Sequence, residues 1–262
     1  MELEKDIRFK ELKELSLDEF ELKCSDDKNI LELRNEIING CVYIIRQALT
    51  KENSYILLNK IINSNLEYTS EPKILEGVKN LYYESNNLKS KKMEYSCVDK
   101  SWYFFPWNKD EIGIFDFIQP IFNKVILLNN KKPIDLVKNT PIDGCVQRFH
   151  LINYPINFGQ ISLHRDPVNV CQVNSGIYLT EYGIDYKEGG FFVLNDEDEE
   201  VNLDEHVHIG DMVLFYPGIG HGVHSIKPMN RKLKSNGRYF LNMTIIQSHH
   251  FEGRMPAVGI DL

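Results

Sequence analysis

Two histidines and an aspartate have the types and spacing needed to hold a metal ion. His164 and Asp166 are separated by a single residue, and His221 follows later in the run Pro217-Gly-Ile-Gly-His-Gly-Val-His224. Two imidazoles and one carboxylate occupy one face of an octahedron around iron(II) and leave the other face open for substrate chemistry. The same side chains also bind zinc. The triad therefore predicts a metal site without fixing the metal.

The local sequence predicts that strands position these ligands. Residues i and i+2 of a β-strand point to the same side, so His164 and Asp166 would project together. The apolar run 210–216 ends in a Pro-Gly turn, and His221 then opens another strand. His224 is an alternative third ligand, and we favour His221. A surface position is expected for His206, His208, His249 and His250.

Arg238 has the chemistry of an anion-binding group. It directly follows Asn236-Gly237, a strong hairpin-turn signal, and opens a strand over 238–246. The same face of that strand would carry Arg238, Phe240, Asn242 and Thr244. A guanidinium offers a rigid fork of donors that suits a carboxylate. We expect Arg238 to point into a polar cavity, the alternative being an arginine on an exposed hairpin.

The two halves of the chain differ in their apolar patterns. Helical spacing is expected over 29–49, with a possible break at Asn39-Gly40, and over 54–62, 72–83 and 112–128, the last interrupted by Pro120. After the turn signal at 141–144, strands are expected near 145–153, 159–165, 172–180, 190–195, 211–216, 222–227 and 238–247. The acidic run 196–200 is expected at a hairpin tip. Seven short strands favour a sandwich or barrel.

Composition limits the protein's class and partners. The chain has 262 residues, a net charge of −8 and no large basic block, which argues against nucleic acid and anionic membranes as partners. Its five cysteines form no C-x-x-C pair, so we expect a reducing compartment. The charged N-terminus and the lack of a long apolar run predict no signal peptide and no membrane span. A cytoplasmic location follows, and the oligomeric state is open.

The segment from about Arg148 to Ile246 resembles the iron(II)/2-oxoglutarate-dependent dioxygenase superfamily. The matching motifs occur in the expected order: Asn153-Tyr-Pro155, His164-x-Asp166, Tyr178-Leu-Thr-Glu181, Asp185-Tyr-Lys-Glu-Gly-Gly190, Gly210-Asp-Met-Val-Leu-Phe215, His221-Gly-Val223 and Gly237-Arg238-Tyr239. The match covers roughly two fifths of the chain. The first half resembles no family that we can name.

The resemblance implies an α+β protein with a double-stranded β-helix core, a jelly-roll or cupin-like fold. It divides the chain into a mainly helical region over 1–140, part of the same globular unit, a catalytic core over 141–250 and a tail over 251–262. It implies that His164, Asp166 and His221 bind iron(II). It also implies that Arg238, with Tyr154, binds the co-substrate 2-oxoglutarate.

The implied reaction is oxidation of a small polar, amino-acid-like metabolite by O₂ through an iron(IV)-oxo intermediate. Asp166 is intact, whereas related halogenases carry a small residue there, so hydroxylation is favoured. Some members have Ser two residues after the arginine, and Phe240 stands here, so a second contact to the co-substrate carboxylate is unassigned. If Tyr154 faces the cavity, strand parity places Arg148 and His150 there as candidate substrate contacts.

Side-chain direction matters at two further places. Arg165 lies between two ligands and should point to the opposite face. The aromatic run 101–107 is expected in the core, with a cavity wall or lid as the alternative. Two further functional classes stay open: a cupin-type metalloenzyme that does not use 2-oxoglutarate, and a non-catalytic jelly-roll binding module.

Overall fold

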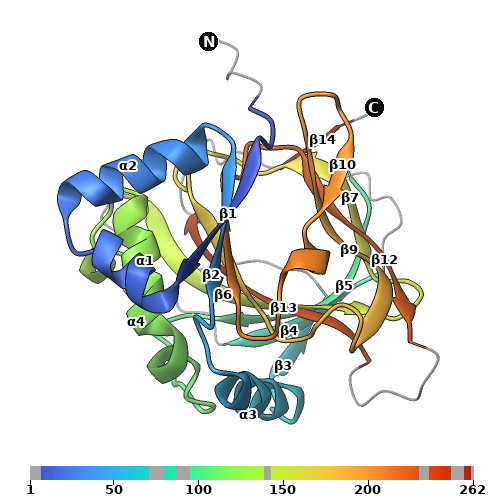
Figure 1. Ribbon diagram of the computed structural model, residues 1–262. Coiled ribbons are helices and arrows are strands. Elements are labelled where there is room, and N and C mark those ends of the chain that lie inside the picture. The colour runs from blue at the N-terminus through green and yellow to red at the C-terminus, as the bar shows by residue number, and fades with distance from the viewer. Residues whose placement is uncertain are drawn as a thin grey trace.

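Eight strands of the chain form two facing sheets, and the chain crosses repeatedly from one to the other. The computed structural model describes residues 7–70, 80–86, 95–138, 143–229, 236–248 and 257–260. The major sheet has the order β11-β8-β13-β6, formed by Met212–Phe215, Asn174–Tyr178, Gly237–Gln247 and Cys145–Pro155. The minor sheet has the order β7-β12-β9-β10, formed by Gln160–Arg165, His221–Pro228, Tyr186–Leu194 and Glu200–Asn202. This winding is a double-stranded β-helix, and the predicted α+β class is confirmed (Figure 1).

Additional strands widen both sheets. On the β11 edge, the major sheet continues into β2 (Cys41–Arg46) and β1 (Glu11–Ser16). On the β6 edge it continues into β5 (Cys97–Phe104), β4 (Leu81–Ser85) and β3 (Glu67–Thr69). The first residues of β5 pair with β7, so this strand joins the two sheets. In the expected C-terminal tail, β14 (Val258–Gly259) adds a further strand to β7.

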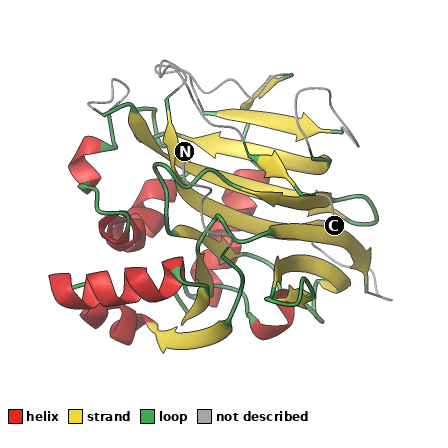
Figure 2. Ribbon diagram, turned by 90° about the horizontal axis from the view of Figure 1, so that it is seen from above, coloured by secondary structure: helices red, strands yellow, loops and turns green. Residues whose placement is uncertain are grey.

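The helices gather on one side of the strands (Figure 2). They are α1 (Leu17–Lys23), α2 (Asp27–Ile38), α3 (Lys51–Ile62) and α4 (Ile114–Leu128), with a short 3-10 turn at Pro133–Asp135 next to α4. A second 3-10 turn, Asp204–His206, packs instead on the barrel strand β9. Helix α2 packs on β2, β11 and α4. Its buried Leu33 and Ile37 join the main apolar core, which continues between the helices and the major sheet. Because the helices pack closely on one face of the major sheet, the sheet rigidly supports the side chains on its other face, which points to the cavity.

The helix predicted over 29–49 is wrong in its second half. It ends at Ile38, and Cys41–Arg46 is a buried strand. Gly40 has φ +108, and a Cβ there would lie 2.3 Å from the carbonyl oxygen of Arg8, so only glycine fits this turn. The next five residues form an apolar run rich in β-branched side chains, which suits a strand buried on both faces.

Two other helix predictions differ from the structure. Leu81, Tyr82 and Tyr83, placed at the end of a predicted helix, lie in β4, and residues 72–79 of that prediction fall outside the described residues. Pro120 lies inside α4 and does not interrupt it. The helix predicted over 54–62 is confirmed as α3.

The strand predictions for the second half are confirmed, with one exception in how they connect. All seven expected strands are present, and the acidic run 196–200 lies at the β9–β10 hairpin tip. Asn236-Gly237 does not form a tight hairpin between β12 and β13, because β13 pairs with β6 and β8. Strands β12 and β13 therefore belong to different sheets.

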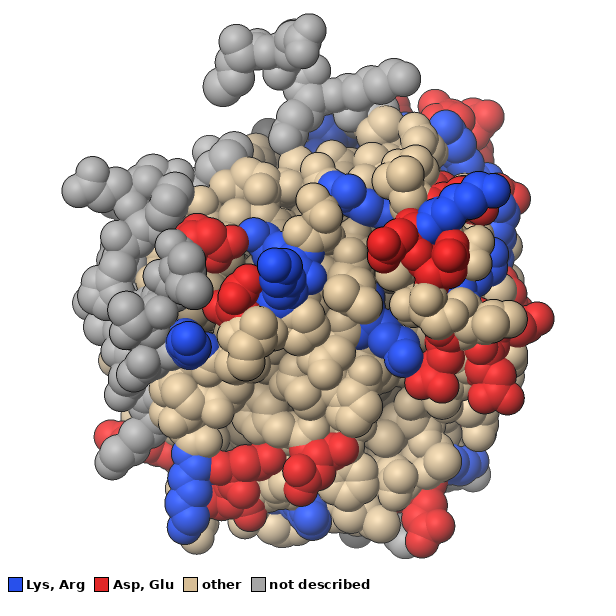
Figure 3. Space-filling model, turned by 90° about the vertical axis from the view of Figure 1, so that its left-hand side faces the viewer, with Lys and Arg blue, Asp and Glu red and all other residues tan. Residues whose placement is uncertain are grey.

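Charges are distributed in small groups over the face seen in Figure 3, where acidic and basic side chains alternate with uncharged ones. Within the described residues, no helix has both the length and the apolar character to cross a membrane. All five cysteines are free and buried.

Candidate metal centre and its cavity

The three predicted ligands converge at one end of the minor sheet. His164 stands near the end of β7 and His221 begins β12, and the antiparallel register places the two opposite each other. Asp166 follows directly after β7. Nε2 of His164 lies 3.8 Å from Oδ1 of Asp166, and Nε2 of His221 lies 3.7 Å from Oδ2 of the same carboxylate. The ligand atoms all lie within 4.8 Å of one another, so a single ion can contact all three.

Backbone carbonyls fix which ring nitrogen of each histidine faces the metal. Nδ1 of His164 bonds to the Ser162 carbonyl at 2.8 Å, and Nδ1 of His221 bonds to the Ile219 carbonyl at 2.8 Å. A carbonyl only accepts, so each Nδ1 carries the proton and each Nε2 presents a lone pair. In this tautomer the Nε2 of each ring is free to bind a metal.

Electrostatics keep two of the ligands in their metal-binding protonation states. Burial, with the neighbouring His221, lowers the pKa of His164 to about 4. For Asp166, burial opposes ionisation, but the nearby His221, His164 and Arg148 outweigh it and lower the pKa to about 2. The donor set therefore suits a divalent transition ion at neutral pH.

His224, the alternative ligand, points away from this centre. Its side chain is 53% exposed and its Nε2 lies 2.6 Å from a Glu200 oxygen. The ring stacks on Phe192 on the outer surface of the minor sheet. The cluster of possible ligands contains His221 and not His224. His206 and His208 are exposed as expected, and His249 and His250 lie outside the described residues.

A cavity of about 330 Å³ between the sheets opens next to the triad. Arg148, His150, Tyr154 and Arg238 all line it, as strand parity predicted. A second cavity of about 390 Å³ adjoins it on the outer side of the centre. The two share five lining residues, which are Tyr95, Arg148, Asp166, Asn174 and Asn242. The arrangement provides an inner and an outer chamber that meet at the centre.

Arg238 is buried and already has a carboxylate partner. Its Nε lies 2.6 Å and its Nη2 lies 3.0 Å from the two oxygens of Asp204, which is itself fully buried. The hydroxyl of Tyr186 donates to the same carboxylate at 2.6 Å. Burial opposes the charge of Arg238, but Asp204 outweighs it and raises the pKa well above its usual value. The exposed-hairpin alternative for Arg238 is excluded.

Sequence reasoning missed Asp204, although a signal for it was present. Gly190, the second glycine of the Gly-Gly motif, has φ +108, and a Cβ there would lie 2.3 Å from an oxygen of Asp204. The motif thus makes room for the carboxylate that holds Arg238. Tyr95 was also missed, and its ring stacks on His164 with centroids 4.8 Å apart.

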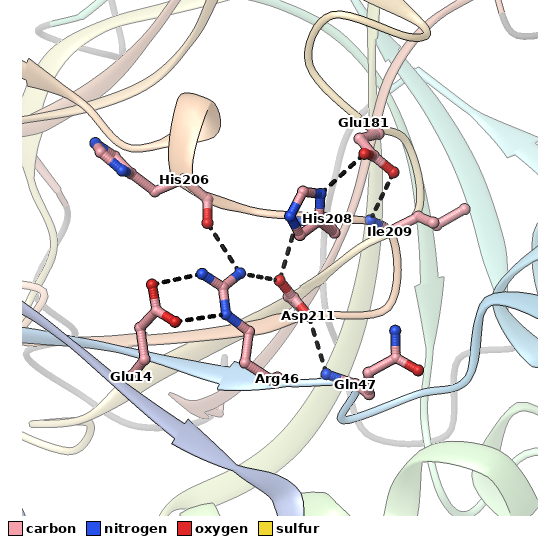
Figure 4. A network of polar contacts seen from close by, with 8 residues as sticks. All are labelled: Glu14, Arg46, Gln47, Glu181, His206, His208, Ile209 and Asp211. Carbon is pink, nitrogen blue, oxygen red and sulfur yellow. Dashed lines mark hydrogen bonds and ion pairs between the residues drawn. The ribbon is translucent and has the colours of Figure 1, made fainter.

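Asp211, the acidic residue of the Gly-Asp strand motif, has a structural position (Figure 4). It accepts hydrogen bonds from the backbone N–H groups of Gln47 and His208, each at 2.9 Å, and from Arg46 at 2.5 Å. Arg46 also pairs with Glu14 of β1. The motif therefore ties the two N-terminal strands to the barrel and supplies no ligand.

The remaining expectations concern side-chain direction. Arg165 does not line either chamber, as its position between two ligands predicted. In the aromatic run 101–107, Trp102, Phe104 and Phe105 are buried. Tyr103, also buried, lines the inner chamber. Both interpretations of the run are therefore partly correct.

Comparison with solved structures places this geometry among known folds. The chain is similar to a Pseudomonas putida prolyl-4-hydroxylase, with a TM-score of 0.51, 13% identity, and coverage of 84% of this chain and 99% of that one. It is also similar to a Trichoplax adhaerens prolyl hydroxylase in complex with a hypoxia inducible factor peptide fragment, with a TM-score of 0.51 and 19% identity over 82% and 90% of the two chains. The chain has the double-stranded β-helix fold of these hydroxylases. No family model and no curated protein matches the sequence.

Proposed function

We propose that the protein is an iron(II)- and 2-oxoglutarate-dependent oxygenase that hydroxylates a small polar metabolite. The observation that carries this proposal is the convergence of two Nε2 lone pairs and one carboxylate beside a cavity lined by a buried arginine. Iron in this donor set would activate O₂ together with an oxidisable 2-oxo acid. His164, Asp166 and His221 would hold one face of the ion and leave the other for reactants.

Arg238 and Tyr154 would bind the distal carboxylate of 2-oxoglutarate. Asp204 contacts two donors of the guanidinium, and an arginine carries five N–H groups. Rings surround Arg238, with Tyr178 and Phe240 each 5.0 Å and Tyr154 5.7 Å from its Cζ. These rings keep water from the guanidinium, and a buried charge-assisted hydrogen bond is stronger than an exposed one.

The substrate would lie where the two chambers meet, against Arg148, which lines both chambers, and His150, which lines the inner one. Asp166 lines both chambers, so a molecule at their junction would lie next to the candidate centre. Arg148 and His150 are the candidate contacts. A cupin-type enzyme that does not use 2-oxoglutarate is the second candidate, because Asp204 already neutralises Arg238.

The test is anaerobic titration of the protein with iron(II) and then with 2-oxoglutarate, recording the weak visible charge-transfer band of the chelate. A saturable band is expected, and its absence in the wild-type protein would refute the proposal and favour the cupin-type alternative. Arg238→Lys should weaken 2-oxoglutarate binding about tenfold or more while iron binding is kept, because lysine lacks the planar fork. Lys187→Met, at the partly exposed Lys187, is the control. Unchanged affinity in Arg238→Lys would reject only the arginine assignment.

A further inference from the structure

Arg148 and His150 form a paired recognition site on the wall of the inner chamber. They are two residues apart on β6, so their side chains point to the same face about 7 Å apart along the strand. Both contact the ring of Tyr103 on β5. The Cζ of Arg148 lies 5.3 Å from that ring's centroid, and the imidazole of His150 stacks on it at 4.4 Å with a 20° interplanar angle. The ring holds the two polar groups in place.

A chain of hydrogen bonds sets the tautomer of His150. The Ser101 hydroxyl donates to Asp99 at 3.3 Å and lies 2.8 Å from Nε2 of His150. A hydroxyl has one hydrogen, and an ionised carboxylate only accepts, so Ser101 must accept from Nε2–H. Nδ1 of His150 then carries a lone pair and is an acceptor.

The charge states of Asp99 and His150 agree with a chain in which His150 donates to Ser101 and Ser101 donates to Asp99. Asp99 is 8% exposed, and burial raises its pKa to about 6, so it is ionised at pH 7.5. Burial and the neighbouring Arg148 lower the pKa of His150 well below its usual value, so the ring is neutral. Arg148 and His150, which both line the chamber, are therefore a donor-only cation beside a neutral ring with one acceptor nitrogen.

A ligand with a carboxylate and an adjacent N–H or O–H donor would match both groups, since a guanidinium carries five N–H donors. Ionised 2-oxoglutarate has only acceptors and would leave Nδ1 of His150 without a partner. Building on the function proposed above, we propose that Arg148 and His150 recognise an α-amino acid as the substrate to be oxidised. Arg148 binds its carboxylate, and His150 accepts from its amino group. Tyr103, Ser101 and Asp99 are positioning residues.

The tautomer can be measured without activity. In protein labelled with ¹⁵N-histidine, long-range ¹H–¹⁵N spectra at pH 7.5 should show His150 protonated at Nε2, with the signal assigned by its loss in His150→Asn. Ser101→Ala should abolish this single-tautomer state, whereas Ser225→Ala, whose hydroxyl bonds to the Asn157 carbonyl, should not. A wild-type ring protonated at Nδ1, or no change in Ser101→Ala, would overturn the assigned chain.

Binding is tested by calorimetry on the anaerobic iron(II)–2-oxoglutarate protein with a panel of free L-α-amino acids. At least one should bind, its α-hydroxy analogue should also bind, and its methyl ester and its analogue without the amino group should bind about tenfold more weakly or worse. Arg148→Met should abolish binding and Arg148→Lys should weaken it, both with the chelate band intact. If no amino acid binds while the band forms, or if Arg148→Met binds normally, the assignment of Arg148 and His150 to an amino acid is refuted and the proposed function is not. A missing band in wild type would instead refute the proposed function.

Discussion

Each histidine of the candidate centre carries its ring proton on the nitrogen that faces away from the metal. The sequence predicted which residues meet, because the period of a strand puts His164 and Asp166 on one side. It did not predict the Ser162 and Ile219 carbonyls that set the tautomers, because these acceptors depend on the local path of the backbone. One hydrogen bond to each histidine therefore decides which of its ring nitrogens can bind a metal.

Separate substitution of His221 and His224 tests the third ligand. His221→Ala should lower iron(II) affinity about a hundredfold, because one of the three candidate protein ligands is lost. His224→Ala should leave iron binding unchanged, since its ring contacts Glu200 on the surface. Metal content after dialysis against a weak chelator measures both. Equal loss in the two variants would contradict the assignment.

Asp99 gives the protein a predictable pH dependence. Its folded pKa of about 6 exceeds the ordinary value of 3.8 because of burial, so the folded state binds the proton more tightly. Stability from this group is therefore full below about pH 4 and falls as pH rises to about 6, by on the order of 3 kcal/mol. Asp99→Asn should gain stability relative to wild type over that interval. Urea unfolding at pH 4.5 and 7.5 measures it, and a pH-independent difference would contradict it.

At the scale of elements, two neighbouring segments cooperate around one arginine. The alternation of β13 places Arg238 on the cavity face, as the sequence predicted. Asp204 comes from the turn after β10 and reaches Arg238 across the barrel. That contact joins a residue of β13 to a residue in a turn 34 positions earlier, so no periodicity in the chain indicates it. Gly190, whose lack of a Cβ leaves room for Asp204, is the residue in the sequence that indicates this contact.

Gly190→Ala tests this packing. The variant combines an unfavourable φ of +108 with a Cβ placed 2.3 Å from Asp204, and should cost about 2 kcal/mol or more of unfolding free energy. Gly183→Ala is a matched control, because Gly183 has φ +76 but no atom lies within 4 Å of the place a Cβ would take. The free energy of unfolding, measured with denaturant, and the affinity for 2-oxoglutarate should both fall more in Gly190→Ala than in Gly183→Ala. Equal effects would show that backbone strain alone is responsible.

At the scale of the whole molecule, the N-terminal region is built into the barrel. Strand β2 pairs with β11, and β5 pairs with both β6 and β7. Asp211, Arg46 and Glu14 add a polar tie across the same edge. We therefore expect residues 1–140 and the barrel to unfold together, since separate unfolding would expose a paired strand edge and apolar core.

Asp211→Ala tests that expectation. It leaves two backbone N–H groups and Arg46 without their buried acceptor, and should cost about 3 kcal/mol. Asp196→Ala, at an exposed hairpin tip, should cost almost nothing. Urea unfolding followed by circular dichroism and by tryptophan fluorescence should give one coincident transition for each protein. Two separate transitions would show that the N-terminal region folds independently.

The candidate metal ligands, seven of the eight barrel strands and the cavity face of β6 and β13 could all be predicted from the sequence. These follow from local rules, namely residue chemistry, the two-residue period of a strand and turn-forming residues. Only the tertiary structure decided that Cys41–Arg46 is a strand, because its pairing with β1 and β11 outweighs helical spacing. It alone brought Asp204 to Arg238 and linked Asp99 through Ser101 to His150, since those contacts depend on how distant segments pack.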